Sequence, residues 1–111
     1  MESKIILFIS ENFGRDIQDI HLGSMIEKDL GIYGDDAVEL ILGFGKKFDV
    51  DVSKFMVAKY FSAEGDFILP PFLKFLMSNK KTKHELTIKN LVDSVKYKKL
   101  DEEIIKISND N

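Results

Sequence analysis

The sequence predicts an all-α fold, a small helical bundle with one long connection after its first helix. Apolar residues recur at helical spacing over residues 2–13, 37–48 and 88–95, and glycines or good capping residues stand at the ends of these segments. A chain of 111 residues with 44% hydrophobic content can bury one modest core. We therefore expect a single domain over residues 1–111.

The first helix is predicted over residues 2–13. Ile5, Phe8 and Ile9 share one face, and Gly14 stands where a helix would stop. The segment 15–34 that follows is polar, but its apolar residues are too frequent for a free loop and too irregular for a long helix. It is expected to be a long connection that packs on the core.

The second helix is predicted to open at Asp35 and Asp36. Asp36 and Glu39 have the spacing of a capping box, and acidic side chains suit the positive end of a helix dipole. Gly43 and Gly45 lower the helix propensity, so packing must hold this helix and a close approach of another element is expected there. The buried stripe of the helix is predicted to consist of Ala37, Leu40, Ile41, Phe44 and Phe48.

The second half of the chain predicts shorter elements. Residues 49–53 alternate as a short extended stretch, a brief helix or turn follows, and a helix over 72–79 can start after Pro70-Pro71. Thr87 is a good N-cap for a helix over 88–95. The last ten residues are expected to fray, with 108–111 as a loose tail. The brief helix is expected to contribute Phe55, Met56, Tyr60 and Phe61 to the core.

Composition excludes several classes of protein. The absence of cysteine excludes disulfides and thiolate chemistry, and no stretch approaches the roughly 20 apolar residues of a membrane-spanning helix, so a cytoplasmic location is expected. The net charge of −3 is uneven: residues 1–66 contain 13 acidic and 7 basic side chains, whereas residues 67–111 contain 6 and 9. The acidic first part would repel nucleic acid and favour a basic partner surface.

Several motifs lie in one order along the chain. DLG at 29–31 ends the long connection, DAVEL at 36–40 lies in the second helix, FDVDV at 48–52 follows it, and TIKNLVDSV at 87–95 forms a late helix. In this order they resemble the acyl carrier protein family over about half the chain. More narrowly, the GDDA motif at 34–37 and the pair Leu86-Thr87 resemble an uncharacterised bacterial group of acyl-carrier-like proteins. The resemblance implies an acyl-carrier-like four-helix bundle with a long first loop, and residues 61–83, where the match fails, as an insertion before the last helix.

The chain departs from that family at the residue that carries the chemistry. In acyl carrier proteins, 4'-phosphopantetheine is esterified to a serine of an Asp-Ser-Leu triplet, and the spacing from DLG places Tyr33-Gly34-Asp35 there. Gly34 has no hydroxyl oxygen, so no prosthetic group is expected at this position. Ser24 is an alternative attachment site, but Ser24 and Glu27 have the spacing of an ordinary capping box.

No constellation in the sequence indicates catalysis or a metal site. Asp49, Asp51 and Ser53 imitate the start of a calcium loop, but later positions lack the required glycine and glutamate. His21 and His84 have no second histidine at helical spacing that could share a metal. We therefore expect neither a catalytic residue nor a metal ligand set.

The sequence thus predicts an acyl-carrier-like, non-enzymatic binding or accessory module. Asp35, Asp36 and Glu39 would recognise a basic surface of a partner protein, and the resemblance implies a fatty-acid or polyketide-type enzyme as that partner. The alternative is a functional acyl carrier with a non-standard attachment site or a noncovalently held acyl chain. An enzyme is the third reading, and the partner's identity and the oligomeric state are left open.

Overall fold

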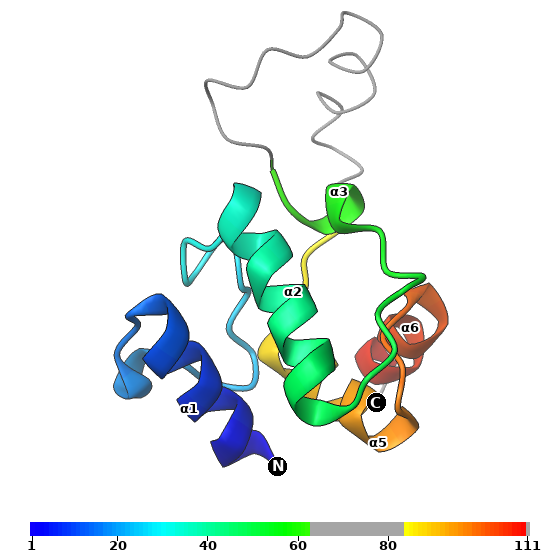
Figure 1. Ribbon diagram of the computed structural model, residues 1–111, viewed down its shortest axis with the longest axis horizontal. Coiled ribbons are helices and arrows are strands. Elements are labelled where there is room, and N and C mark those ends of the chain that lie inside the picture. Colours follow the sequence, from blue (N-terminus) through cyan, green and yellow to red (C-terminus); the bar gives the residue numbers. More distant parts are fainter. Residues whose placement is uncertain (63–83, 111) are drawn as a thin grey trace, which may run out of the picture.

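The computed structural model describes residues 1–62 and 84–110, and these residues form a compact, all-helical globule with four main helices and no strand (Figure 1). The predicted all-α class is therefore confirmed. The predicted helix over 72–79 and nearly all of the predicted insertion lie outside the described residues. The elements are α1 (Glu2–Phe13), the 3-10 turn η1 (Ile17–Asp19), α2 (Gly34–Phe48), the short α3 (Val57–Tyr60), α5 (Ile88–Tyr97) and α6 (Glu102–Asn109).

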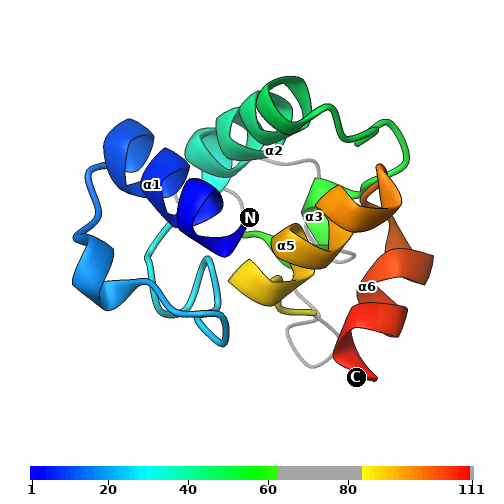
Figure 2. The ribbon, with the colours of Figure 1, turned by 90° about the horizontal axis from the view of Figure 1, so that it is seen from below.

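One apolar core joins these helices. Helix α5 packs against α1 on one side and α6 on the other, and α2 packs across α1 (Figure 2). The predicted stripe of α2 faces this core: Ala37, Leu40, Ile41 and Phe44 are buried, and Phe48 is partly buried against it. Burial of each such large side chain stabilises the fold by about 1.5–3 kcal/mol.

Two glycines of α2 admit close neighbours, as their positions in the sequence predict. A Cβ atom on Gly43 would lie 3.3 Å from Cζ of Phe8 in α1, and one on Gly45 would lie 2.9 Å from the carbonyl oxygen of Val50. The chain turns back at Asp49, which has a left-handed φ of 57° and caps the helix. The N–H of Val50 then donates to the carbonyl of Gly45 at 2.9 Å. Gly45 thus makes room for the turn that ends α2.

The long connection between α1 and α2 packs on the core, as predicted. Ile20, Ile26, Leu30 and Ile32 are all buried. The Arg15 guanidinium also joins the start of the connection to its end by hydrogen bonds. It donates to the carbonyl of Phe13 at the end of α1, to that of Leu30 at 2.5 Å and to that of Gly31 at 3.3 Å.

The prediction of a frayed C-terminus was wrong. Residues 102–109 form α6, and Ile104, Ile105 and Ser108 are buried in it. The Asp101 side chain accepts from the N–H of Ile104 at 3.0 Å and so caps the helix. Ser108 also donates to Asp93 of α5 at 2.6 Å, so α6 is held at both ends rather than left in solvent. The fourth main helix is therefore α6, which comes after the helix expected to be last.

The later elements confirm one prediction and correct another. Thr87 caps α5 as predicted, in a full capping box with Asn90. Met56, in contrast, was predicted to lie in the core and is 54% exposed. It is the N-cap of the four-residue α3, where the extended backbone turns its side chain outward while Phe55 stacks on Tyr60 with ring centroids 5.1 Å apart.

No helix in the described ranges is long and apolar enough to cross a membrane.

Candidate functional site

The candidate site is built around the first turn of α2, where Gly34 is the first helical residue. Gly34 has a φ of +61°, which lies in the left-handed region. This conformation costs a residue with a Cβ atom about 1–2 kcal/mol, whereas glycine adopts it freely. Its N–H donates to the carbonyl oxygen of Ser62 at 2.9 Å. The residue before it, Tyr33, is extended and 46% exposed. The backbone at this position is thus suited to glycine and unfavourable for serine.

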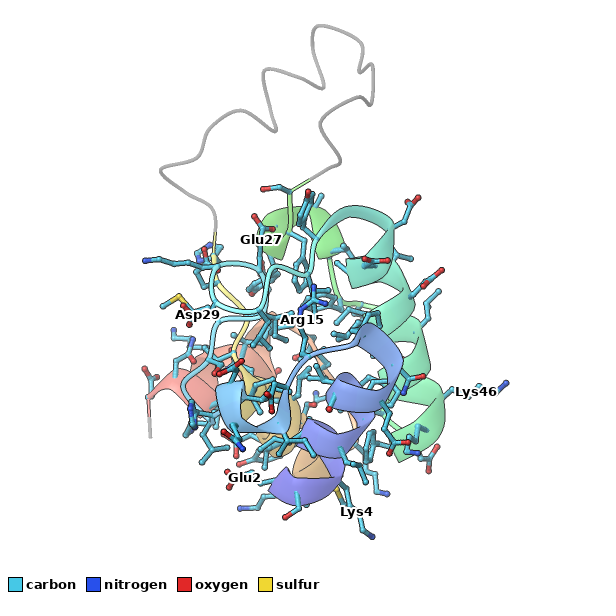
Figure 3. The ribbon with its side chains drawn as sticks, turned by 90° about the vertical axis from the view of Figure 1, so that its left-hand side faces the viewer. Glu2, Lys4, Arg15, Glu27, Asp29 and Lys46 are labelled. Atoms are coloured by element: carbon cyan, nitrogen blue, oxygen red, sulfur yellow. The ribbon has the colours of Figure 1, made fainter. Side chains whose placement is uncertain are left out.

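Glu27 ties the long connection to the residue that pairs with Gly34. Its two carboxylate oxygens accept from the backbone N–H of Ser62 at 2.6 Å and from the Ser62 hydroxyl at 2.8 Å. The side-chain view places Glu27 in the loops at the end of the molecule where α2 begins (Figure 3). Glu27, Gly34 and Ser62 come from three separate segments, and nothing in their sequence spacing predicts that they meet.

Asp35, Asp36 and Glu39 lie in the first turns of α2, as predicted, and all three are exposed. The predicted capping box is wrong, because the N-cap is Tyr33 and no side chain caps the helix. The helix begins at Gly34, so Asp36 already has helical geometry and cannot act as a cap. None of the three carboxylates makes a hydrogen bond or ion pair with another residue of the described ranges. Their charges therefore face solvent at the positive end of the helix.

Exposed apolar side chains lie beside these acids, which the sequence analysis missed. Leu42 is 61% exposed on the side of α2 opposite the buried stripe, and Val38 is 41% exposed on the flank of the helix beside it. A helical projection of the α2 sequence could have found them, because both fall outside the core-facing positions. The site thus combines negative charge with accessible apolar surface.

Ser24, the alternative attachment site, is only 6% exposed. Its hydroxyl accepts from the N–H of His21 at 2.9 Å, and its carbonyl accepts from the N–H of Ile88 at 3.1 Å. The predicted capping box with Glu27 is wrong, since Ser24 lies in a turn and Glu27 binds Ser62 instead. A transferase would have to open this turn to reach the Ser24 hydroxyl.

The calcium-like motif forms a turn. The Asp51 carboxylate accepts from the N–H of Ser53 at 2.9 Å, and this hydrogen bonding by Ser53 lowers the pKa of Asp51. Within residues 1–62 and 84–110, no three His, Asp or Glu side chains are placed to hold a metal ion together.

The other perturbed groups lie between α3 and the start of α6 and between α5 and the end of α6. Burial raises the pKa of Tyr60, and the nearby charge of Glu102 raises it further. A hydrogen bond from Lys59 at 2.5 Å lowers the pKa of Glu102. Burial alone would raise the pKa of Asp93, but hydrogen bonds from Ser108 and Lys89 outweigh it and lower the pKa. These pairs join helices to one another and are separate from the first turn of α2.

The fold and the site together define a small all-helical protein whose second helix begins at a left-handed glycine within an acidic turn. The chain belongs to the family described as "Protein of unknown function (DUF1493)", whose profile matches residues 1–100. It is also similar to an acyl carrier protein of Rickettsia bellii (strain RML369-C), with 36% identity over 52 residues. This match covers 47% of the chain and 60% of the relative, so the chain spans less than two thirds of that relative's length. No solved structure matches the chain.

Proposed function

We propose that this protein is an acyl-carrier-like, non-enzymatic binding module without a covalently attached arm at the start of α2. The observation that carries the proposal is Gly34, which has no hydroxyl and a φ of +61°. The partial similarity to an acyl carrier protein supports a carrier-like scaffold. The left-handed backbone supports a scaffold in which this position no longer serves an attachment reaction.

The proposed partner is a protein with a basic surface, such as a fatty-acid or polyketide-type enzyme. Asp35, Asp36 and Glu39 are exposed and have no partner among the described residues, so their charges are available to an incoming protein. Such charges raise association rates and select partners more than they add to affinity. The exposed Leu42 offers apolar area that the same partner could cover.

The intact mass of the protein, purified after co-expression with a broad-specificity phosphopantetheinyl transferase, tests the absence of an arm. The expected result is the mass of the unmodified chain. A mass increased by one phosphopantetheine would contradict the proposal and make the protein a working carrier. A matched carrier that contains the usual serine, expressed alongside, shows that the transferase is active.

A second candidate function, a carrier with its arm on another serine, is favoured by one observation. Ser62 lies beside Gly34, and its hydroxyl is exposed at the same end of the molecule, although it donates to Glu27. Ser62→Ala and Ser24→Ala variants in the mass experiment distinguish the two serines. Loss of an added mass in only one of them would identify the attachment site.

A further inference from the structure

The outer face of α2 bears a stripe of residues with a definite charge order. Asp35, Glu39, Leu42 and Lys46 are spaced at i, i+4, i+7 and i+11, which places them within about 60° of one another at about 100° per residue. This stripe lies opposite the buried stripe, and Leu42 at its middle is 61% exposed. Lys46 points away from the body of the molecule (Figure 3). The stripe is therefore acidic at its start, apolar in its middle and basic at its end.

The charges of this stripe cannot satisfy one another within the helix. Glu39 and Lys46 are seven residues apart, or about 10 Å along the axis, beyond the i, i+4 distance at which helix side chains pair. Neither makes an ion pair with another residue of the described part of the chain. Both are thus free to pair with charges on another molecule.

The order of charges is self-complementary when the helix is reversed. If two copies of α2 lie antiparallel with a two-fold axis at Leu42, then Leu42 meets its equivalent in the second copy. Glu39, three residues before Leu42, then lies opposite Lys46 of the second copy, four residues after its Leu42. The two-fold axis repeats the pair of Glu39 with Lys46, so the interface contains two ion pairs around a central contact between the two Leu42 side chains. Val38, which is 41% exposed, flanks that contact.

We propose that the outer face of α2 is the docking site for a second copy of this chain, packed antiparallel across Leu42. A single helix face buries less than the roughly 1,200 Å² of a stable interface, so the dimer is weak and depends on protein concentration. Its ion pairs are exposed, so salt weakens it. The proposal does not rest on the function proposed above, but dimerisation would cover Glu39 and compete with a basic partner.

Sedimentation velocity over a protein concentration series, at low and high salt, tests the dimer. The wild-type protein is expected to pass from monomer to dimer as concentration rises toward the order of 1 mM, and less so at high salt. Leu42→Asp is expected to stay monomeric, because it places two carboxylates at the centre of the contact. Ile17→Asp is the matched control: Ile17 is 52% exposed but lies in η1, so this variant should dimerise as the wild type does.

A charge swap tests the register. Lys46→Glu and Glu39→Lys should each weaken dimerisation on the order of tenfold, and the double variant should restore it, because each copy then carries both reversed charges. Helical circular dichroism confirms that each variant is folded. A wild-type protein that stays monomeric throughout, or a dimer unaffected by Leu42→Asp, would overturn the proposal. A double variant weaker than both single variants would overturn the antiparallel register. Sedimentation uses the purified protein alone, so an effect of Leu42→Asp on dimerisation is separable from loss of a basic partner.

Discussion

The backbone N–H of Gly34 donates to the carbonyl oxygen of Ser62 at 2.9 Å, and this bond fixes the start of α2 against the segment that follows α3. The carboxylate of Glu27 accepts hydrogen bonds from the N–H and the hydroxyl of the same Ser62. Gly34, which the resemblance to acyl carrier proteins aligns with their serine, therefore lies in a clamp formed by Glu27, Gly34 and Ser62. A left-handed glycine holds the clamp in place without the strain that a side chain would add.

Substitution of Gly34 is the first prediction. Gly34→Ala is expected to lower the free energy of unfolding by about 1 kcal/mol, because alanine disfavours a φ of +61°. Urea denaturation measures the change. Gly23→Ala is the matched control, since a Cβ there would meet open space and its φ is not in the left-handed region, so no loss is expected. Equal stability of the two variants would show that Gly34 does not need its left-handed conformation.

Removal of the Glu27 carboxylate is the second prediction. Glu27→Ala removes the carboxylate that accepts from the Ser62 N–H and hydroxyl, and it should lower the free energy of unfolding by about 1–2 kcal/mol. Glu11→Ala, at an exposed carboxylate of α1, removes the same charge without removing this clamp. Hydrogen exchange of the Gly34 amide should become faster only in the Glu27 variant. Unchanged exchange there would mean that the start of α2 does not depend on Glu27.

The third prediction contrasts two glycines of α2. Alanine normally stabilises a helix interior relative to glycine by up to about 1 kcal/mol. In Gly45→Ala, however, the new Cβ would meet the backbone carbonyl of Val50 at 2.9 Å, so a net loss of about 1–3 kcal/mol is expected. In Gly43→Ala the nearest atom is Cζ of Phe8 at 3.3 Å, at the end of a side chain that can shift. Thermal denaturation should therefore rank Gly45→Ala as clearly the less stable variant.

The fourth prediction concerns pH. The pKa of Asp93 is lowered in the folded protein, so its carboxylate contributes stability that is present above its ordinary value of 3.8 and is lost as pH falls through the folded pKa. Asp93→Asn is expected to be less stable than the wild type near neutral pH. The difference should shrink below about pH 4 as the wild-type carboxylate becomes protonated.

Unfolding midpoints of both proteins, measured from neutral to acid pH, test the role of Asp93. The carboxylate accepts hydrogen bonds from Lys89 at 2.9 Å and from Ser108 at 2.6 Å, so a Ser108→Ala variant should show a similar but smaller loss. A stability difference that does not depend on pH would show that packing, rather than the charge of Asp93, holds α6 on α5.

The fifth prediction addresses partner binding. Replacement of Asp35, Asp36 and Glu39 by alanine is expected to weaken capture of the partner and to flatten the dependence of binding on salt. A control variant with Glu2, Glu11 and Glu103 replaced removes the same charge from α1 and α6. Pull-down with mass-spectrometric identification compares the two. Unchanged capture by the first variant would contradict the assignment of this acidic turn.

Local patterns in the sequence were enough for the helical class, the bounds of α1, the start of α5 with its Thr87 cap, and the buried stripe of α2. Each depends on residues within a few positions of one another, where helical spacing and capping chemistry act directly. The missing serine hydroxyl at Gly34 is likewise a property of the sequence alone.

Only the tertiary structure decided how distant segments meet. Glu27, Gly34 and Ser62 form a clamp because the fold brings two loops and the start of α2 to one end of the molecule. Helix α6, expected to fray, is held by Asp93 and Ser108 across two helices, a contact that local propensity does not contain. Local spacing thus determined where α1, α2 and α5 form, whereas long-range hydrogen bonds determined that α6 is held on α5 and that Glu27 and Asp93 are engaged.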